Sequence, residues 1–175
     1  EDGWPVIGID GKVPEVLDLP PGKGLIPGIV APDEFKRKKG DPPLPLVWQW
    51  NHNPDNALWS VTQRKGFLRL TAGRTDTLFT QARNTLTQRT LGPECSGSTL
   101  IDVSGMKEGD FAGLALLQKK YGIVGVKYSN GIRSVVMVNA QSGSPEEVES
   151  IPLTRKKVYL KAECDFTDRR DIAYF

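Results

Sequence analysis

The sequence predicts an all-β fold, an antiparallel sandwich or barrel. After Pro45, short β-like runs are separated by turn residues about every 8–12 positions, which is typical of such folds. Asn130-Gly131 lies between two alternating runs and supplies the positive φ angles that a two-residue hairpin turn requires. No segment has the apolar spacing of a long helix. We therefore expect two layers of antiparallel sheet.

The expected strands are short and follow one another closely. In Lys157–Phe166, alternate residues are apolar and the residues between them are mostly charged, so one face of this strand is expected to be buried and the other wet. The last run reads as the beginning of a further strand, and we expect the sandwich to be incomplete at the C-terminus. The expected strands are 46–50, 66–72, 78–88, 98–104, 111–118, 122–128, 132–140, 147–153, 157–166 and 172–175.

The first 45 residues have a different amino-acid composition. Gly and Pro are abundant there, which favours an extended, turn-rich path, so this part is expected to be a connector with one short strand over Trp4–Ile9. The basic cluster Phe35–Asp41 is best explained as a solvated loop.

Composition restricts the partners. The 175 residues include 23 basic and 21 acidic side chains, and the formal charge of +2 indicates neither a nucleic acid nor an anionic membrane surface as a partner. No apolar run approaches the roughly 20 residues needed to span a bilayer, and the N-terminus lacks a signal-peptide pattern. Cys95 and Cys164 are expected to be free thiols. The bacterial cytoplasm is slightly favoured over secretion.

Standard catalytic motifs are absent. The sequence contains no nucleophile elbow, no phosphate-binding glycine loop with a lysine and no pair of cysteines at metal-ligand spacing. His52 is the one histidine, and a turn histidine that bonds locally explains it better than a general base does. The acid pairs Asp165 with Asp168 and Glu146 with Glu147 lie in polar turns. We expect no catalytic residue in this chain.

The stretch Trp48–Trp59 holds three of the four tryptophans and the histidine. Two readings are open. In a strand, Trp48 and Trp50 share a face, and flat indoles suit the apolar face of a sugar, with Trp59 and His52 beside them. Alternatively, that face is turned inward and at least one indole is buried in the core, which we favour. The segment Asn53–Asn56 is a turn in both cases.

A second candidate is the strand expected over 78–88. In an extended strand Arg83 and Arg89 lie on one face, while Asn84 and Gln88 lie on the other, so both faces carry polar groups. Such a strand can line a groove where guanidinium and amide groups bind oxygens. A solvated sheet face explains it equally well.

The sequence resembles the C-terminal β-sandwich of glycoside hydrolase family 43 enzymes, the β-xylosidases and α-L-arabinofuranosidases. The resemblance covers about Pro45 to Phe175, and Asp2–Pro14 is similar to the segment by which those enzymes leave their N-terminal five-bladed propeller. It implies a concanavalin A-like or jelly-roll sandwich, with 1–20 as the end of the propeller and start of the linker, 21–44 as linker and 45–175 as sandwich. The resemblance rests on "WQWNHNPDNALWSVTQRKGFLRLTAG", "ARNTLTQRTLGPECSG", "DVSGMKEGDFAGLALLQKKYGIVGVKY" and "DFTDRRDIAYF".

The same resemblance implies a function. Catalysis would lie in the propeller, and this chain would be an accessory module that packs on the propeller and shapes its pocket for xylan- or arabinan-derived oligosaccharides. An independent module that binds xylo-oligosaccharides is the alternative, and a homo-oligomer stays open. No cofactor is required, but related sandwiches can hold a structural calcium, for which Asp33 and Glu34 would offer a carboxylate. The carbohydrate-binding candidates are Trp50, His52, Trp59, Arg83, Asn84, Gln88 and Arg89.

Overall fold

The structure, a computed structural model, describes residues 8, 12–13, 16 and 28–175. The strand expected over Trp4–Ile9 lies outside the described residues, except for Gly8. Within the described part no helix is long and apolar enough to cross a membrane. Short 3-10 helices are η1 (Asn56–Leu58), η2 (Phe79–Gln81) and η3 (Thr167–Arg169). The strands are β1 (Gln49–Trp50), β2 (Trp59–Ser60), β3 (Arg69–Leu70), β4 (Leu86–Thr87), β5 (Glu94–Asp102), β6 (Phe111–Leu116), β7 (Gly122–Ser129), β8 (Ile132–Asn139), β9 (Glu146–Pro152), β10 (Lys157–Asp165) and β11 (Ile172–Tyr174).

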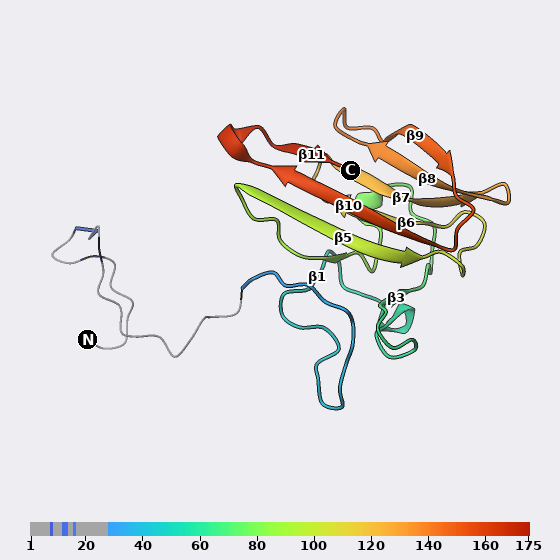
Figure 1. The fold of residues 1–175 in the computed structure, drawn as a ribbon, viewed down its shortest axis with the longest axis horizontal. Coiled ribbons are helices and arrows are strands. Elements are labelled where there is room, and N and C mark those ends of the chain that lie inside the picture. The colour runs from blue at the N-terminus through green and yellow to red at the C-terminus, as the bar shows by residue number, and fades with distance from the viewer. Residues whose placement is uncertain (1–7, 9–11, 14–15, 17–27) are drawn as a thin grey trace.

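Two antiparallel sheets form the body of the fold. One has the strand order β11-β10-β5 and the other β6-β7-β8-β9. In Figure 1 the first sheet lies in front of the second, and β10 packs across β6 and β7. Two small sheets are also present, β1-β4 and β2-β3, and in Figure 1 the labelled strands β1 and β3 lie below β5. This architecture confirms the predicted all-β, antiparallel sandwich.

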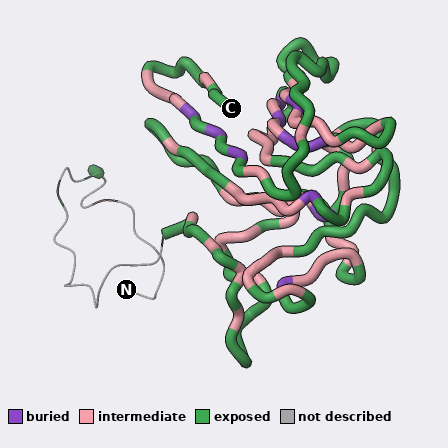
Figure 2. Tube along the Cα trace, turned by 45° about the vertical axis from the view of Figure 1, so that its right-hand side comes forward, coloured by how far each residue is buried: buried purple, intermediate pink, exposed green. Residues whose placement is uncertain are grey.

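The core between the sheets follows the alternation of β10. Leu160, Ala162 and Cys164 are buried, whereas Lys161 and Glu163 between them are exposed. Cys95 of β5 lies directly opposite Cys164, and both are free thiols. Burial raises the pKa of the Cys164 thiol to about 11, so this thiol stays protonated. Figure 2 shows that the buried positions gather mostly in the two sheets.

The β7–β8 connection is the hairpin that the sequence predicts. Asn130 and Gly131 have φ angles of 53° and 77°, as a turn with two positive φ angles requires. Their backbone N–H groups donate to the carboxylate of Glu108 at 2.6 and 3.2 Å. The hairpin is therefore anchored by the preceding loop as well as by its own turn residues.

A second apolar cluster ties the first half of the chain to the four-stranded sheet. Tyr121, Ile123 and Ala140 are buried there, and Phe79 of η2 packs against them. The Phe79 and Tyr121 rings meet edge to face with centroids 5.3 Å apart. This contact fixes η2, and with it the polar residues that follow, on the sandwich.

The prediction of a strand over 78–88 is wrong. The segment instead forms η2, a turn in which Asn84 has a φ of 57°, and the two-residue strand β4. The apolar residues Leu78 and Phe79 resemble a strand, but Phe79 packs as part of a 3-10 turn. Arg83, Asn84, Gln88 and Arg89 therefore do not alternate on two faces of one strand.

Candidate functional site

Trp50 and Trp59 form a pair, one from β1 and one from β2. Their ring centroids are 5.2 Å apart and their planes are tilted by 53°. The Trp59 indole N–H donates to Asn56 Oδ1 at 2.9 Å. Both residues are half-buried, so the pair partly covers itself and does not present one flat plane to a sugar ring.

Trp48 has a separate environment. Its ring stacks on Phe35 with centroids 5.7 Å apart, and its indole N–H donates to Asp33 Oδ2 at 2.9 Å. Trp48 is half-buried, as Trp50 is. The expectation that at least one of these indoles is buried in the core is therefore wrong, because Trp48 packs on Phe35 and Trp50 packs on Trp59 instead.

Asp33 is already fully engaged. Arg37 donates to its two oxygens at 2.8 and 2.6 Å, and the Phe35 backbone N–H donates at 2.7 Å. The Arg37 guanidinium, opposed by partial burial, lowers the pKa of Asp33, and Trp48 and Phe35 lower it further. A calcium ion would have to displace Arg37, and in the described part no three His, Cys, Asp or Glu side chains gather as metal ligands. Asp33 and the exposed Glu34 thus fit calcium poorly, and calcium binding stays a prediction.

Two of the predicted sugar ligands hold the chain together. Asn84 is buried and bonds to both backbone groups of Asp55, accepting from its N–H at 2.8 Å and donating to its carbonyl at 3.1 Å. Gln88 bonds in the same way to both backbone groups of Ala31, at 3.0 and 2.8 Å. Their amide groups therefore satisfy the backbone of Asp55 and of Ala31, while Arg89 is exposed.

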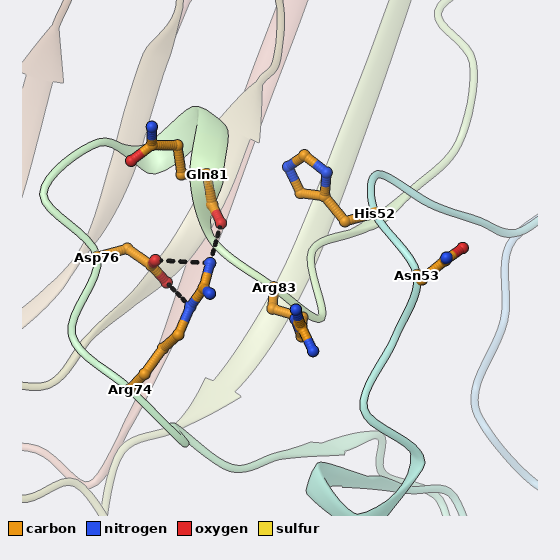
Figure 3. Close-up of a pocket in the computed structure, with 6 residues that line it drawn as sticks. All are labelled: His52, Asn53, Arg74, Asp76, Gln81 and Arg83. Carbon is orange, nitrogen blue, oxygen red and sulfur yellow. Dashed lines mark hydrogen bonds and ion pairs between the residues drawn. The ribbon is translucent and has the colours of Figure 1, made fainter.

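An open polar cleft lies between the turn after β1, the loop that follows β3, and η2. Its volume is about 580 Å³, and six residues line it. Figure 3 shows them projecting from three different segments of the chain. Sequence reasoning singled out two of them, and no local signal marks the rest as a site. The six residues are His52, Asn53, Arg74, Asp76, Gln81 and Arg83.

The wall of this cleft is held by charge-assisted bonds. Arg74 donates to Asp76 through Nε at 3.1 Å and lies 2.8 Å from it through Nη2, which also donates to the Gln81 carbonyl at 2.9 Å. His52 Nε2 lies 2.8 Å from the Thr80 carbonyl. Because a carbonyl only accepts, this nitrogen carries the proton, which leaves Nδ1 as an acceptor in the neutral ring.

Three acidic residues elsewhere make structural bonds, namely Asp102, Glu147 and Asp165. Asp102 accepts from Ser104 and from Arg64, and these bonds hold the pKa of its carboxyl well below its usual range. Asp165 pairs with Arg170 at 2.7 Å, and Glu147 pairs with Lys127 at 2.9 Å. Neither arrangement places two free carboxylates across a cleft, as glycoside hydrolysis requires.

A family model described as the β-xylosidase C-terminal concanavalin A-like domain of glycoside hydrolase family 43 matches residues 33–175. The chain belongs to this family. The match includes most of the described residues and starts at Asp33, within the stretch expected to be linker. The match confirms the prediction, made from the resemblance of the sequence, that the chain is a GH43 C-terminal domain.

Relatives of this GH43 domain are parts of longer proteins. A β-xylosidase of Formosa agariphila is 31% identical over 153 residues, and a putative β-xylosidase of Xylanibacter ruminicola is 33% identical over 132 residues. Each match covers 72% of this chain but only 25% and 24% of the relative, so the chain spans about a quarter of their length. A solved structure described as a bifunctional GH43-CE protein of Bacteroides eggerthii is 63% identical to this chain, with a TM-score of 0.86. The match covers 100% of this chain and 23% of the Bacteroides eggerthii chain.

Proposed function

We propose that this GH43 domain is an accessory module that packs on a catalytic propeller and helps to shape its pocket. The parent enzyme would act on xylan- or arabinan-derived oligosaccharides. The observation that carries the proposal is the match to a C-terminal domain whose relatives extend far beyond it. The relatives named β-xylosidases support a pentoside as the substrate.

The segment 46–91 offers a surface for such packing. It lies between residues 28–45 and β5 in the chain, and in Figure 1 its labelled strands β1 and β3 lie below β5. A neighbour joined through residues 28–45 would have a high effective concentration next to it. Four leucines of the segment 46–91 are exposed and are available to contact a partner. These are Leu46, Leu70, Leu78 and Leu91, at 99%, 50%, 43% and 40% exposure.

The test is association with the upstream part of the parent enzyme. Sedimentation velocity of the two parts together should show a complex, and the double variant Leu46→Ser, Leu70→Ser should weaken it. Val148→Ser is a matched control, because Val148 is 56% exposed on β9, outside this segment. Failure to associate, or equal weakening by both variants, would contradict the proposal.

The alternative, an independent sugar-binding module, makes a different prediction. Xylo-oligosaccharides would then bind this chain alone with calorimetric heat, and Trp50→Ala would abolish the binding. The tilted pair of Trp50 and Trp59 gives less support to this reading than a coplanar pair would. We therefore expect no measurable heat with neutral xylo-oligosaccharides.

A further inference from the structure

Two thiols face each other across the strands β5 and β10. Cys95 is the register partner of Cys164, so the two side chains lie on the same face of the sheet. The two strands run side by side in Figure 1 and pair from one end of β10 to the other. The chain contains two cysteines, so each thiol has one possible partner within the chain, and that partner is its neighbour across the ladder.

The backbone spacing at this pair suits a disulfide. Two residues on from the cysteines, the Phe166 N–H donates to the Pro93 carbonyl at 2.7 Å. Antiparallel pairs alternate, so the cysteines also form a hydrogen-bonded pair, whose Cα atoms are about 5.5 Å apart. Disulfides join Cα atoms about 4.4–6.8 Å apart, most often about 5.5–6 Å. The bond then requires the two Cβ atoms to approach each other by about 1 Å.

Small neighbours leave room for this bond and for a reagent. On the same face, Gly97 and Ala162 form the next pair along the ladder, and Ala173 of β11 lies opposite Cys164. Gly97 is exposed, and no heavy atom beyond its chain neighbours lies within 4 Å of the place where a Cβ would stand. Cys95, two residues away, is half-buried, whereas Cys164 is buried. Cys95 is therefore the more accessible of the two thiols.

We propose that Cys95 and Cys164 form a disulfide when the domain meets a low-molecular-weight disulfide such as oxidised glutathione. Cys95 loses its proton and its sulfur attacks the oxidant, which gives a mixed disulfide and releases one glutathione thiol. The Cys164 sulfur then attacks the Cys95 sulfur, and its proton leaves with the second glutathione thiol. Two protein thiols are thus oxidised while one glutathione disulfide is reduced to two thiols.

The disulfide would fasten β5 covalently to β10. In the three-stranded sheet β5 is an end strand, and β10 is its neighbour in that sheet. The inference depends on the register of these two strands and not on the proposed function, so packing on a catalytic domain can fail without affecting it.

The test is incubation of the folded 175-residue chain with oxidised glutathione, followed by intact-mass measurement and peptide mapping. We expect a monomer that has lost two hydrogen atoms, with the peptides of Cys95 and Cys164 joined. Cys164→Ala should stop after the first step and carry one glutathione on Cys95. Cys95→Ala should react at least about tenfold more slowly than Cys164→Ala, because burial and a pKa raised to about 11 protect the Cys164 thiol.

The two variants are matched, since each keeps one thiol of the pair. The proposal is overturned if the folded chain keeps both thiols free in excess oxidised glutathione, if it stops at a glutathione adduct, or if it joins two chains instead. Equal reaction of the two variants would overturn the assignment of Cys95 as the attacking thiol. The cross-link itself is measured on the unsubstituted chain, so misfolding of a variant would not hide the result.

Discussion

Asn84 is a buried polar residue whose loss is expected to destabilise this fold. It is 7% exposed and has a φ of 57°, a backbone conformation that alanine adopts unfavourably. Its amide satisfies both the N–H and the carbonyl of Asp55, at 2.8 and 3.1 Å. Asn84→Ala removes both bonds and leaves two backbone groups of the turn without their partner.

The expected cost follows from these contacts. Losing a hydrogen bond and leaving its partner unpaired costs about 1–3 kcal/mol, and Asp55 is half-buried, so we take about 1 kcal/mol for each bond. Placing alanine in the left-handed region adds about 1 kcal/mol. Asn84→Ala should therefore lower the free energy of unfolding by about 3 kcal/mol. For a domain of this size, that corresponds to a Tm about 6–12 °C lower.

Urea unfolding followed by circular dichroism measures this cost, with an unchanged m-value as the sign that only stability has changed. Asn84→Gly separates the two causes, because glycine tolerates the positive φ but lacks the amide. We expect Asn84→Gly to cost about 1 kcal/mol less than Asn84→Ala. A loss below about 1 kcal/mol for Asn84→Ala, or equal costs for the two variants, would refute the reasoning.

The remaining predictions concern the core, the linker and the tryptophan pair. Leu160→Ala should cost about 2–5 kcal/mol in urea unfolding because its side chain is 4% exposed, whereas Tyr159→Ala, 77% exposed, should cost under about 1 kcal/mol. A carboxylate whose pKa is lowered by folding stabilises above its ordinary value of 3.8, and this contribution is lost as the pH falls through the lower folded pKa. Asp33→Asn should therefore lower the free energy of unfolding at pH 7 and make that free energy fall less steeply as the pH drops below 4. An unchanged pH dependence below pH 4 would count against the pair with Arg37. Trp50→Ala should lower the Tm through lost packing on Trp59, and an unchanged Tm would show that the pair carries no stability.

The second half of the fold could be predicted from the sequence because its signals are local. The alternation around Leu160 and Ala162 depends on neighbours two residues away, and Asn130-Gly131 determines its own turn. Each expected strand after residue 94 therefore matches an observed strand, apart from shifts at the ends.

The first half could not be predicted in the same way, because distant partners determine its conformation. Asn84 folds back onto Asp55, and Gln88 holds Ala31, with sequence separations of 29 and 57 residues. No periodicity marks such bonds, so the sequence alone does not distinguish residues that hold the backbone of Asp55 and Ala31 from sugar ligands. The cleft likewise depends on tertiary structure, since Arg74 and Arg83 line the same cleft only after η2 has packed on the sheet.

Hydrogen–deuterium exchange on the full-length parent and on this chain alone tests the central claim most directly. If the module packs on the catalytic part through the segment 46–91, amides of that segment should exchange more slowly in the parent, while those of the exposed strand β9 should not change. Identical exchange of 46–91 in the two proteins would contradict the account.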